Sequence, residues 1–181
     1  RNLPALAHIA AFLGHKAGEH FALLHEGLIK EAMRERLFSD GVFWSAADHD
    51  YKRIKVSTWA NFAPLFADLY TKAEADALME KYFNDSGTLR SQFGIRTVSK
   101  QEPSYRPDGF WRGPVWFAPH WFIYKGLRAY GYKDEAKFLQ RANLALLERN
   151  GFREYFNPET GEPYGATDFT WGTLTLDMME E

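Results

Sequence analysis

Four carboxylates near the C-terminal end of the sequence are the side chains best suited to acid–base chemistry: Glu154, Glu159, Glu162 and Asp168. A carboxylate can take a proton from water, and a carboxylic acid can donate one. Glu159 and Glu162 fall in a turn, where solvent screening is expected, and Asp168 falls where a helix needs an N-cap. We interpret these three as structural. Glu154 precedes the turn, and a glutamate in such a place is usually a solvated loop residue, so its local context alone gives little support for catalysis.

A second candidate group is the segment Phe-Trp-Arg-Gly-Pro-Val-Trp at residues 110–116. Arg112 lies between a tryptophan and Gly-Pro at the start of an expected helix, and an arginine there is costly to bury without a partner. We expect its planar fork to meet either a carboxylate, such as that of Glu154, or sugar hydroxyls. Trp111 is expected to line a site, whereas for Trp116 packing in the core and lining a site are about equally favoured.

Aromatic residues make up 17% of the 181 residues and concentrate after residue 100, among glycines, prolines and charged groups. This mixture suits stacking against sugar rings, whose C–H faces are apolar while their hydroxyls need polar partners. Tyr155 and Trp171 are candidate lining residues, with packing the favoured role for Tyr155. His120 follows Pro119 at a helix start, and we expect it to be a hydrogen-bonded core or cap histidine.

The spacing of apolar residues predicts about seven helices to position these side chains. The first expected helix covers 3–13, the second carries Phe21, Leu24, Leu28 and Ala32 on one face, and the third is capped by Ser57 or Thr58 and runs to about residue 70. Thr71 caps the fourth, the fifth follows Pro114 or Pro119 and ends at 130, the sixth covers 133–149, and the last starts at Asp168 or Thr170. Gly14 should break the first pair, and Thr71 with Glu74 should form a capping box. Long turn-rich connections are expected at 38–56, 84–112 and 152–167. Tight turns alternating with long loops are typical of a ring of helical hairpins with a cleft at one end. No linker divides the chain, so residues 1–181 are treated as one unit.

Taken in order, these segments resemble glycoside hydrolase family 63, whose members include processing α-glucosidases and bacterial hydrolases of mannosylglycerate and glucosylglycerate. Residues 111–116 are similar to the family's Trp-Arg-Gly-Pro-Val-Trp, and Phe-Gly-Ile-Arg-Thr at 93–97, then Ser-Tyr at 104–105, resemble its Gly-Ile-Pro-Thr and Pro-x-Tyr. Residues 154–161 are similar to its Glu-Tyr-Tyr-Asp-Pro-x-Thr-Gly, and 169–171 to its Phe-x-Trp. The resemblance covers essentially the whole chain.

The resemblance implies an all-α fold, the C-terminal half of an (α/α)6 barrel, and inverting hydrolysis of α-glycosidic bonds in small glycosides or oligosaccharides. Glu154 matches the position of the family's general base. Substrate contacts are expected from Trp111, Arg112, Trp116, Tyr155 and Trp171.

The family's general acid is an aspartate in a Trp-Asp-x-Ser segment of the first half of the barrel. This sequence contains no such segment, and Asp48 and Asp108 lack that context. The resemblance therefore implies that the acid and the N-terminal half of the barrel come from residues outside these 181, in the same polypeptide or a separate chain. Without that half, we expect inner apolar side chains such as Phe62, Leu65 and Phe66 to be exposed and the chain to associate.

Two other functions remain open. A trehalase shares the barrel, although residues 165–169 do not match the Phe-Gly-Trp-Thr-Asn segment of trehalases. A non-catalytic carbohydrate-binding or scaffold module would keep the aromatic cleft without an acid. One departure from family 63 also concerns substrate contacts: many relatives continue Val-Trp with two prolines and an asparagine, where this chain has Phe-Ala-Pro-His at 117–120.

Charge and composition argue against several other classes of protein. The net charge of -2 leaves no basic stripe for nucleic acid and no polybasic membrane patch. The chain has no cysteine, and its six histidines show no ligand spacing, so we expect no metal and no cofactor. No apolar run approaches the length of a membrane helix, and the absence of cysteine is compatible with a cytoplasmic location.

Overall fold

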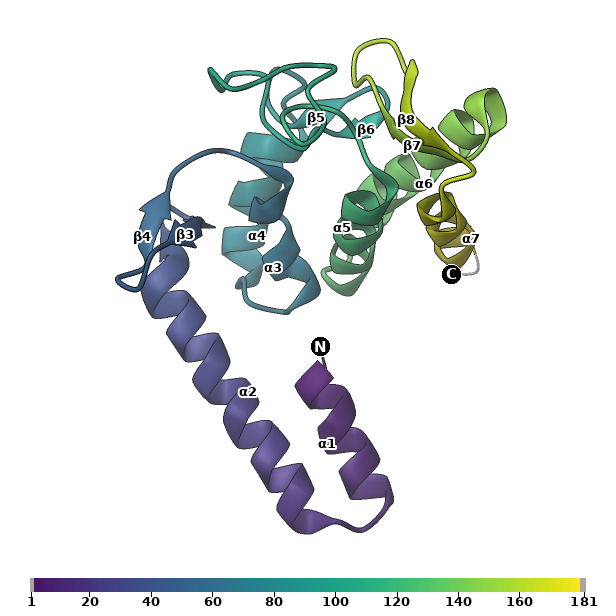
Figure 1. Cartoon of the computed structure of the whole chain (residues 1–181). Helices are drawn as coiled ribbons and strands as arrows, with labels where there is room; N and C mark the ends of the chain where they lie inside the picture. The colour runs from purple at the N-terminus through teal and green to yellow at the C-terminus, as the bar shows by residue number, and fades with distance from the viewer. Residues whose placement is uncertain (1, 180–181) are drawn as a thin grey trace. The chain divides into compact units, whose positions relative to one another are not determined.

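The computed structural model describes residues 2–179, which divide after Arg53 into two compact units (Figure 1). We call residues 2–53 unit 1 and residues 54–179 unit 2. Helices are the main elements of both units, and each sheet in the described part of the chain has only two strands. The fold class is therefore all-α, as predicted.

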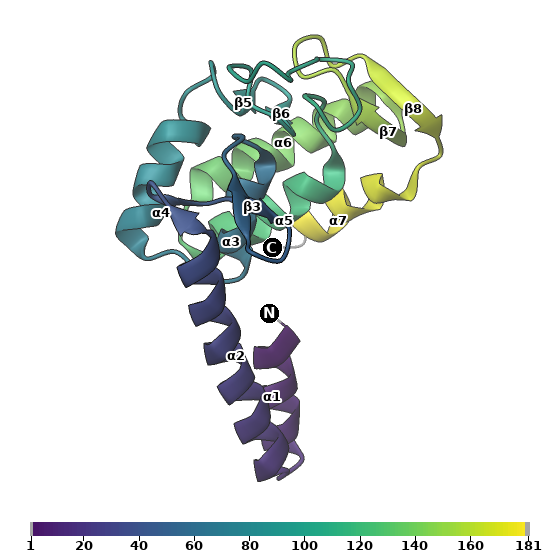
Figure 2. The same cartoon turned by 60° about the vertical axis from the view of Figure 1, so that its left-hand side comes forward.

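Unit 1 is a helical hairpin followed by two short β-hairpins. Helices α1 (Asn2–Phe12) and α2 (Lys16–Leu37) pack against each other (Figures 1 and 2). The predicted break is confirmed, because Gly14 has a φ of +68°, which glycine adopts without strain. His15 then caps α2 by accepting a hydrogen bond from the Gly18 N–H at 3.0 Å. Strand β1 (Phe38–Ser39) pairs with β2 (Val42–Phe43), and β3 (Ser45–Ala47) with β4 (Lys52–Ile54).

Unit 2 is organised around its two longest helices, α5 (Phe117–Ala129) and α6 (Lys133–Asn150), which pack against each other (Figure 2). Its other helical elements are η1 (Trp59–Asn61), α3 (Ala63–Phe66), α4 (Lys72–Leu78), the π-helical η2 (Met79–Phe83), η3 (Thr170–Thr173) and α7 (Leu174–Met179). Gly126 allows α3 to approach α5 closely, since a Cβ at this position would lie 2.7 Å from the Leu65 Cβ.

The predicted capping box at the start of α4 is confirmed. The Thr71 hydroxyl accepts from the Glu74 N–H, and the Glu74 carboxylate accepts from the Thr71 N–H at 2.8 Å. Of the two starts expected for the last helical segment, Thr170 is confirmed and the N-cap role of Asp168 is wrong. Phe169 occupies the N-cap position of η3 without a side-chain hydrogen bond, and Asp168 is exposed with a φ of +55°.

The three long connections contain short β-hairpins that the sequence did not predict. Strand β5 (Arg90–Ser91) pairs with β6 (Gly94–Ile95), and β7 (Arg153–Phe156) pairs with β8 (Pro163–Thr167). The paired strands of the three connections are two to five residues long, too short for the alternation of apolar and polar residues that identifies a strand.

The apolar side chains predicted to be exposed are mostly buried, and other apolar side chains are exposed. Phe62 and Leu65 are fully buried within unit 2, and Phe66 is half-buried. Phe62 meets the Phe83 ring edge-on at 6.2 Å. A row of exposed apolar side chains follows the helical hairpin of unit 1: Leu6, Ile9, Phe12, Leu13, Phe21, Leu23, Leu24, Leu28 and Ile29.

His120 is a core histidine, as predicted. It is fully buried, and its Nε2 accepts a hydrogen bond from the Ile95 N–H at 2.8 Å. The proton therefore lies on Nδ1, which donates to Asn143 Oδ1 at 2.6 Å. Gly94 makes room for the ring, since a Cβ there would lie 2.1 Å from His120 Cε1. Burial lowers the pKa of His120 and outweighs the Asn143 and Ile95 oxygens, which accept hydrogen bonds from the protonated ring and raise the pKa, so the buried ring is neutral.

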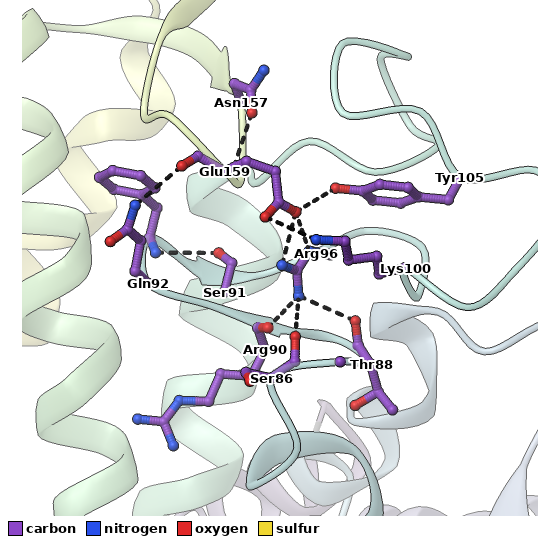
Figure 3. Close-up of polar contacts among 12 residues, drawn as sticks. Ser86, Thr88, Arg90, Ser91, Gln92, Arg96, Lys100, Tyr105, Asn157 and Glu159 are labelled. Atoms are coloured by element: carbon purple, nitrogen blue, oxygen red, sulfur yellow. Dashed lines mark hydrogen bonds and ion pairs between the residues drawn. The ribbon is translucent and has the colours of Figure 1, made fainter.

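A buried guanidinium joins the long loop at 84–112 to the turn between β7 and β8 (Figure 3). The Arg96 side chain is 3% exposed and donates to Glu159 Oε1 from Nε at 3.0 Å and from Nη2 at 2.8 Å. Its Nη1 donates to the backbone carbonyls of Ser86, Thr88 and Arg90. One side chain thereby fixes two segments that are far apart in the sequence.

Glu159 also interacts with Tyr105 and Lys100. The prediction that solvent screens this carboxylate in the turn is therefore wrong. It accepts from the Tyr105 hydroxyl at 2.6 Å and forms an ion pair with Lys100 at 3.3 Å. Burial opposes the ionisation of Glu159, but hydrogen bonds from Tyr105 and Arg96 outweigh it, and the pKa of the carboxyl lies below its ordinary value. Burial and the hydrogen bond to Glu159 raise the pKa of Tyr105 to about 12. The charge therefore stays on Glu159 and the proton on Tyr105.

Replacing His120 by alanine removes a partner from two buried polar groups and opens a cavity, so the free energy of unfolding should fall by about 3 kcal/mol in chemical denaturation. Because folding depresses the pKa of His120 from 6.5, its contribution is present above that value and is lost as the pH falls. We expect wild-type stability to decline as the pH falls below about 6.5, and the variant to show a flatter profile. His49→Ala, on the exposed loop of unit 1, is the control. An equally steep profile in His120→Ala would contradict this role.

Replacing Arg96 by methionine should lower the free energy of unfolding by about 3 kcal/mol, because it leaves Glu159 and three carbonyls without the guanidinium. Lys100→Met removes the exposed partner of the same carboxylate and should cost less than about 1 kcal/mol. The depressed pKa of Glu159 adds stability above its unfolded pKa of 4.5 that is lost as the pH falls below it. Equal losses in the two variants, measured by urea titration at neutral pH, would show that Arg96 is not the organising partner.

Candidate active site

The hairpin of β7 and β8 carries Glu154 on a strand rather than on the loop that the sequence predicted. Arg153 pairs with Thr167 and Tyr155 with Tyr164, with an irregularity in the register between Arg153 and Tyr155. Glu154 is half-buried at this point, and its Oε2 accepts a hydrogen bond from the Ala166 N–H at 3.0 Å. A carboxylate is therefore held at a defined place on the hairpin.

The Trp-Arg-Gly-Pro-Val-Trp segment is attached directly to β7. Val115 and Phe156 exchange two backbone hydrogen bonds, of 2.9 and 3.1 Å. Both side chains belong to the buried core that also contains Phe117 and Leu146. The segment that carries the predicted substrate contacts and the strand that carries Glu154 thus form one packed structure.

An aromatic cluster covers this junction, and it contains four of the five predicted substrate contacts. Trp116 stacks on Trp111 at 4.0 Å with an interplanar angle of 8°, and on Tyr155 at 4.9 Å with an angle of 14°. The Trp171 centroid lies 5.6 Å from that of Trp116, and Phe110 meets the same ring edge-on at 5.0 Å. Residues from three separate segments therefore meet around one indole.

The members of the aromatic cluster differ in what they offer to a ligand. Trp116 is 2% exposed and donates from Nε1 to the Phe110 carbonyl at 2.9 Å, so it supports the other rings. Phe110 and Trp111 are exposed, and Tyr155 and Trp171 are half-buried. Burial and the negative charge of Glu154 raise the pKa of the Tyr155 hydroxyl. Tyr155 is thus a neutral ring beside a carboxylate.

Arg112 does not form the ion pair with Glu154 that the sequence suggested. Its side chain is exposed, and the described residues offer its guanidinium neither an ion pair nor a side-chain hydrogen bond. Its backbone carbonyl accepts from the Arg106 N–H at 2.7 Å. The position before Gly-Pro is therefore at the surface, where no buried charge needs a partner. Arg112 remains a candidate for contact with sugar hydroxyls.

The buried arginine of this region is Arg96, which sequence reasoning missed together with Glu159 and Tyr105. One signal was present: Arg96 stands where the family's Gly-Ile-Pro-Thr segment has a proline. An arginine in place of a proline in a buried turn needs a partner, but nothing in the sequence identified a glutamate 63 residues away.

Neither a metal site nor a membrane-spanning helix is found in residues 2–179. No three histidine, aspartate or glutamate side chains come together in a way that could hold a metal ion. Within the same range, none of the helices combines the length and the apolar character needed to cross a bilayer.

Comparison with known proteins agrees with this geometry. The model of the mannosylglycerate hydrolase MGH1-like glycoside hydrolase domain matches residues 1–172. A mannosylglycerate hydrolase of Rubrobacter radiotolerans is 36% identical over 131 residues, which is 71% of this chain and 30% of that protein. This chain thus spans about a third of the length of that relative.

Solved structures of glycoside hydrolases have a similar fold. A family 63 mannosylglycerate hydrolase from Thermus thermophilus, in complex with glucose, superposes with a TM-score of 0.83 at 28% identity, over 99% of this chain and 45% of that one. The neutral trehalase Nth1 from Saccharomyces cerevisiae gives a TM-score of 0.60 at 20% identity, over 90% of this chain and 30% of that one, and supports the fold alone. The neighbours are (α/α)6 barrel glycosidases, which confirms the predicted fold class. The chain belongs to the MGH1-like glycoside hydrolases of family 63.

Proposed function

We propose that this chain forms part of the catalytic domain of an enzyme that hydrolyses α-glycosidic bonds in small glycosides, with mannosylglycerate and glucosylglycerate as the substrates to test first. Glu154 is the general base. The observation that carries the proposal is a half-buried carboxylate held by a backbone amide beside an aromatic cluster with exposed rings. The family and its named mannosylglycerate hydrolases support the same reaction class.

The proposed reaction is a single displacement with inversion. Glu154 takes a proton from water while the water oxygen bonds to the anomeric carbon, and the glycosidic C–O bond breaks as its oxygen receives a proton from a carboxylic acid. The two carboxyl groups of such enzymes lie about 6.5–9.5 Å apart, which leaves room for the water. We assign the acid to residues outside this sequence, because no segment here matches the family's acid.

The aromatic cluster and Arg112 would bind the sugar. The exposed face of Trp111 suits stacking on the apolar face of a pyranose, and Tyr155 and Trp171 would border the same surface. Trp116 holds these rings in place from below. The exposed guanidinium of Arg112 forms no ion pair or hydrogen bond with the side chains of the described residues. Its planar fork suits paired hydrogen bonds to hydroxyls.

We also propose that the whole chain belongs to one catalytic domain, which the rest of an (α/α)6 barrel completes. One family model matches residues on both sides of the division at Arg53. The Thermus enzyme is more than twice as long as this chain, since the chain covers 45% of it. The row of exposed apolar side chains on α1 and α2 is the surface that the remaining helices would cover.

The 181 residues alone should therefore associate. We expect sedimentation velocity to show dimers or larger species, because the exposed apolar side chains of α1 and α2 lose contact with water on association. Replacing Phe12 and Leu13 by serine should shift the distribution toward monomer, whereas replacing the exposed polar residues Lys16 and His20 should leave it unchanged. A stable wild-type monomer at micromolar concentration would contradict the proposal.

Replacing Glu154 by glutamine in the complete enzyme should lower kcat by about 10²–10⁴-fold with little change in KM, because the base is lost while the aromatic surface remains. Initial rates on mannosylglycerate and glucosylglycerate measure this, with trehalose as the substrate that would indicate a trehalase. Glu162→Gln alters an exposed carboxylate of the same hairpin and should retain full turnover. Unchanged turnover in Glu154→Gln would remove Glu154 from its role, and sugar binding without any hydrolysis by the wild type would indicate a binding module.

A further inference from the structure

The irregularity in the β7–β8 hairpin lies directly opposite Glu154. Arg153 pairs with Thr167 and Tyr155 with Tyr164, so one residue of β7 faces two residues of β8, Gly165 and Ala166. This two-against-one arrangement is a β-bulge. Bulges change the direction of a side chain locally and are common beside active sites.

Gly165 is required by two features of the bulge. Its φ is +69°, in the left-handed region that favours glycine. A Cβ there would also lie 2.3 Å from Glu154 Oε2, 2.8 Å from Glu154 Cβ and 2.9 Å from Tyr155 Cε1. The missing side chain of Gly165 is therefore the space in which the carboxylate lies.

Ala166 supplies the contact that fixes the carboxylate in that space. Its N–H donates to Glu154 Oε2 at 3.0 Å. None of the described residues forms a hydrogen bond with Glu154 Oε1. One carboxylate oxygen is thus held by the backbone, and the other is left for a proton from outside the hairpin.

We infer that the Gly165–Ala166 bulge is the positioning element of the general base: the glycine makes the space for the Glu154 carboxylate, and the Ala166 amide sets the direction of its second oxygen. The inference rests on the proposed role of Glu154. Gly165 and Ala166 are positioning residues, since they act through Glu154 and take no part in proton transfer.

The test compares Gly165→Ala with Gly131→Ala in the complete enzyme. Gly131 also has a positive φ, +82°, but a Cβ there would meet nothing within 4 Å. Both variants place an alanine in the left-handed region of φ, which strains the backbone. Only in Gly165→Ala does the added Cβ clash with the Glu154 carboxylate. We expect both to lower Tm, and only Gly165→Ala to lower kcat, by about 100-fold with KM changed less than about twofold on mannosylglycerate or glucosylglycerate.

A double variant tests whether Gly165 acts through Glu154. Glu154→Asp keeps Cβ but shortens the side chain, which withdraws the carboxylate oxygen from its 2.3 Å contact with the added Cβ. The kcat losses of Gly165→Ala and Glu154→Asp should therefore be less than multiplicative when combined. Multiplicative losses, or a Gly165→Ala enzyme that turns over like Gly131→Ala, would overturn the inference. If either result is found while Glu154→Gln is inactive, the inference about Gly165 fails but the proposed function of Glu154 stands. If Glu154→Gln is fully active, the proposed function itself fails.

Hydrogen exchange tests the contact between Glu154 and the Ala166 amide even if Gly165→Ala does not fold. In Glu154→Ala, the Ala166 amide loses its acceptor and should exchange markedly faster, while the amide of Phe156, which donates to the Val115 carbonyl, should keep its rate. Unchanged exchange at Ala166 would show that the carboxylate does not hold this amide and would overturn the inference.

Discussion

The geometry of the candidate site depends on the buried guanidinium of Arg96. Three of its contacts go to carbonyls of the loop at 84–112, and two go to Glu159 in the turn between β7 and β8. A buried charge of this kind is tolerated only when its donors are satisfied, so the two segments have little freedom relative to each other. The loop contains Trp111 and the turn belongs to the hairpin of Glu154. The Arg96–Glu159 ion pair therefore adds to the Val115–Phe156 hydrogen bonds in fixing the exposed rings relative to the carboxylate.

The aromatic side chains near that ion pair differ in burial, and the buried ring supports the exposed ones. Trp116 is buried, held by its own hydrogen bond and stacked on two rings, while Trp111 presents a face to solvent. A fixed and well-packed support is what keeps an exposed ring in one orientation. The same division appears in the hairpin, where Phe156 lies in the core and Glu154 beside it does not.

Several helices and some of their boundaries could be predicted from the sequence because their determinants are local. Gly14 and the Thr71–Glu74 capping box act within four residues, and both are confirmed. The hairpins could not be predicted, because strands of two to five residues carry no periodic pattern. The ordered resemblance of the segments identified the family, yet the partner of Arg96 and the surface position of Arg112 depend on contacts between distant residues that local motifs do not encode.

The separation of 63 residues between Arg96 and Glu159 has a consequence for how the molecule acquires its order. Helices α5 and α6 lie within that interval and can form from local contacts, whereas joining the ends of so long a segment costs chain entropy that only later packing offsets. The hairpin should consequently be among the last parts of unit 2 to become fixed during refolding, an order that pulse-labelling of amide protons reports directly. Closure of the Glu154 hairpin would then mark the end of folding of unit 2 and report on it more sensitively than helix content does.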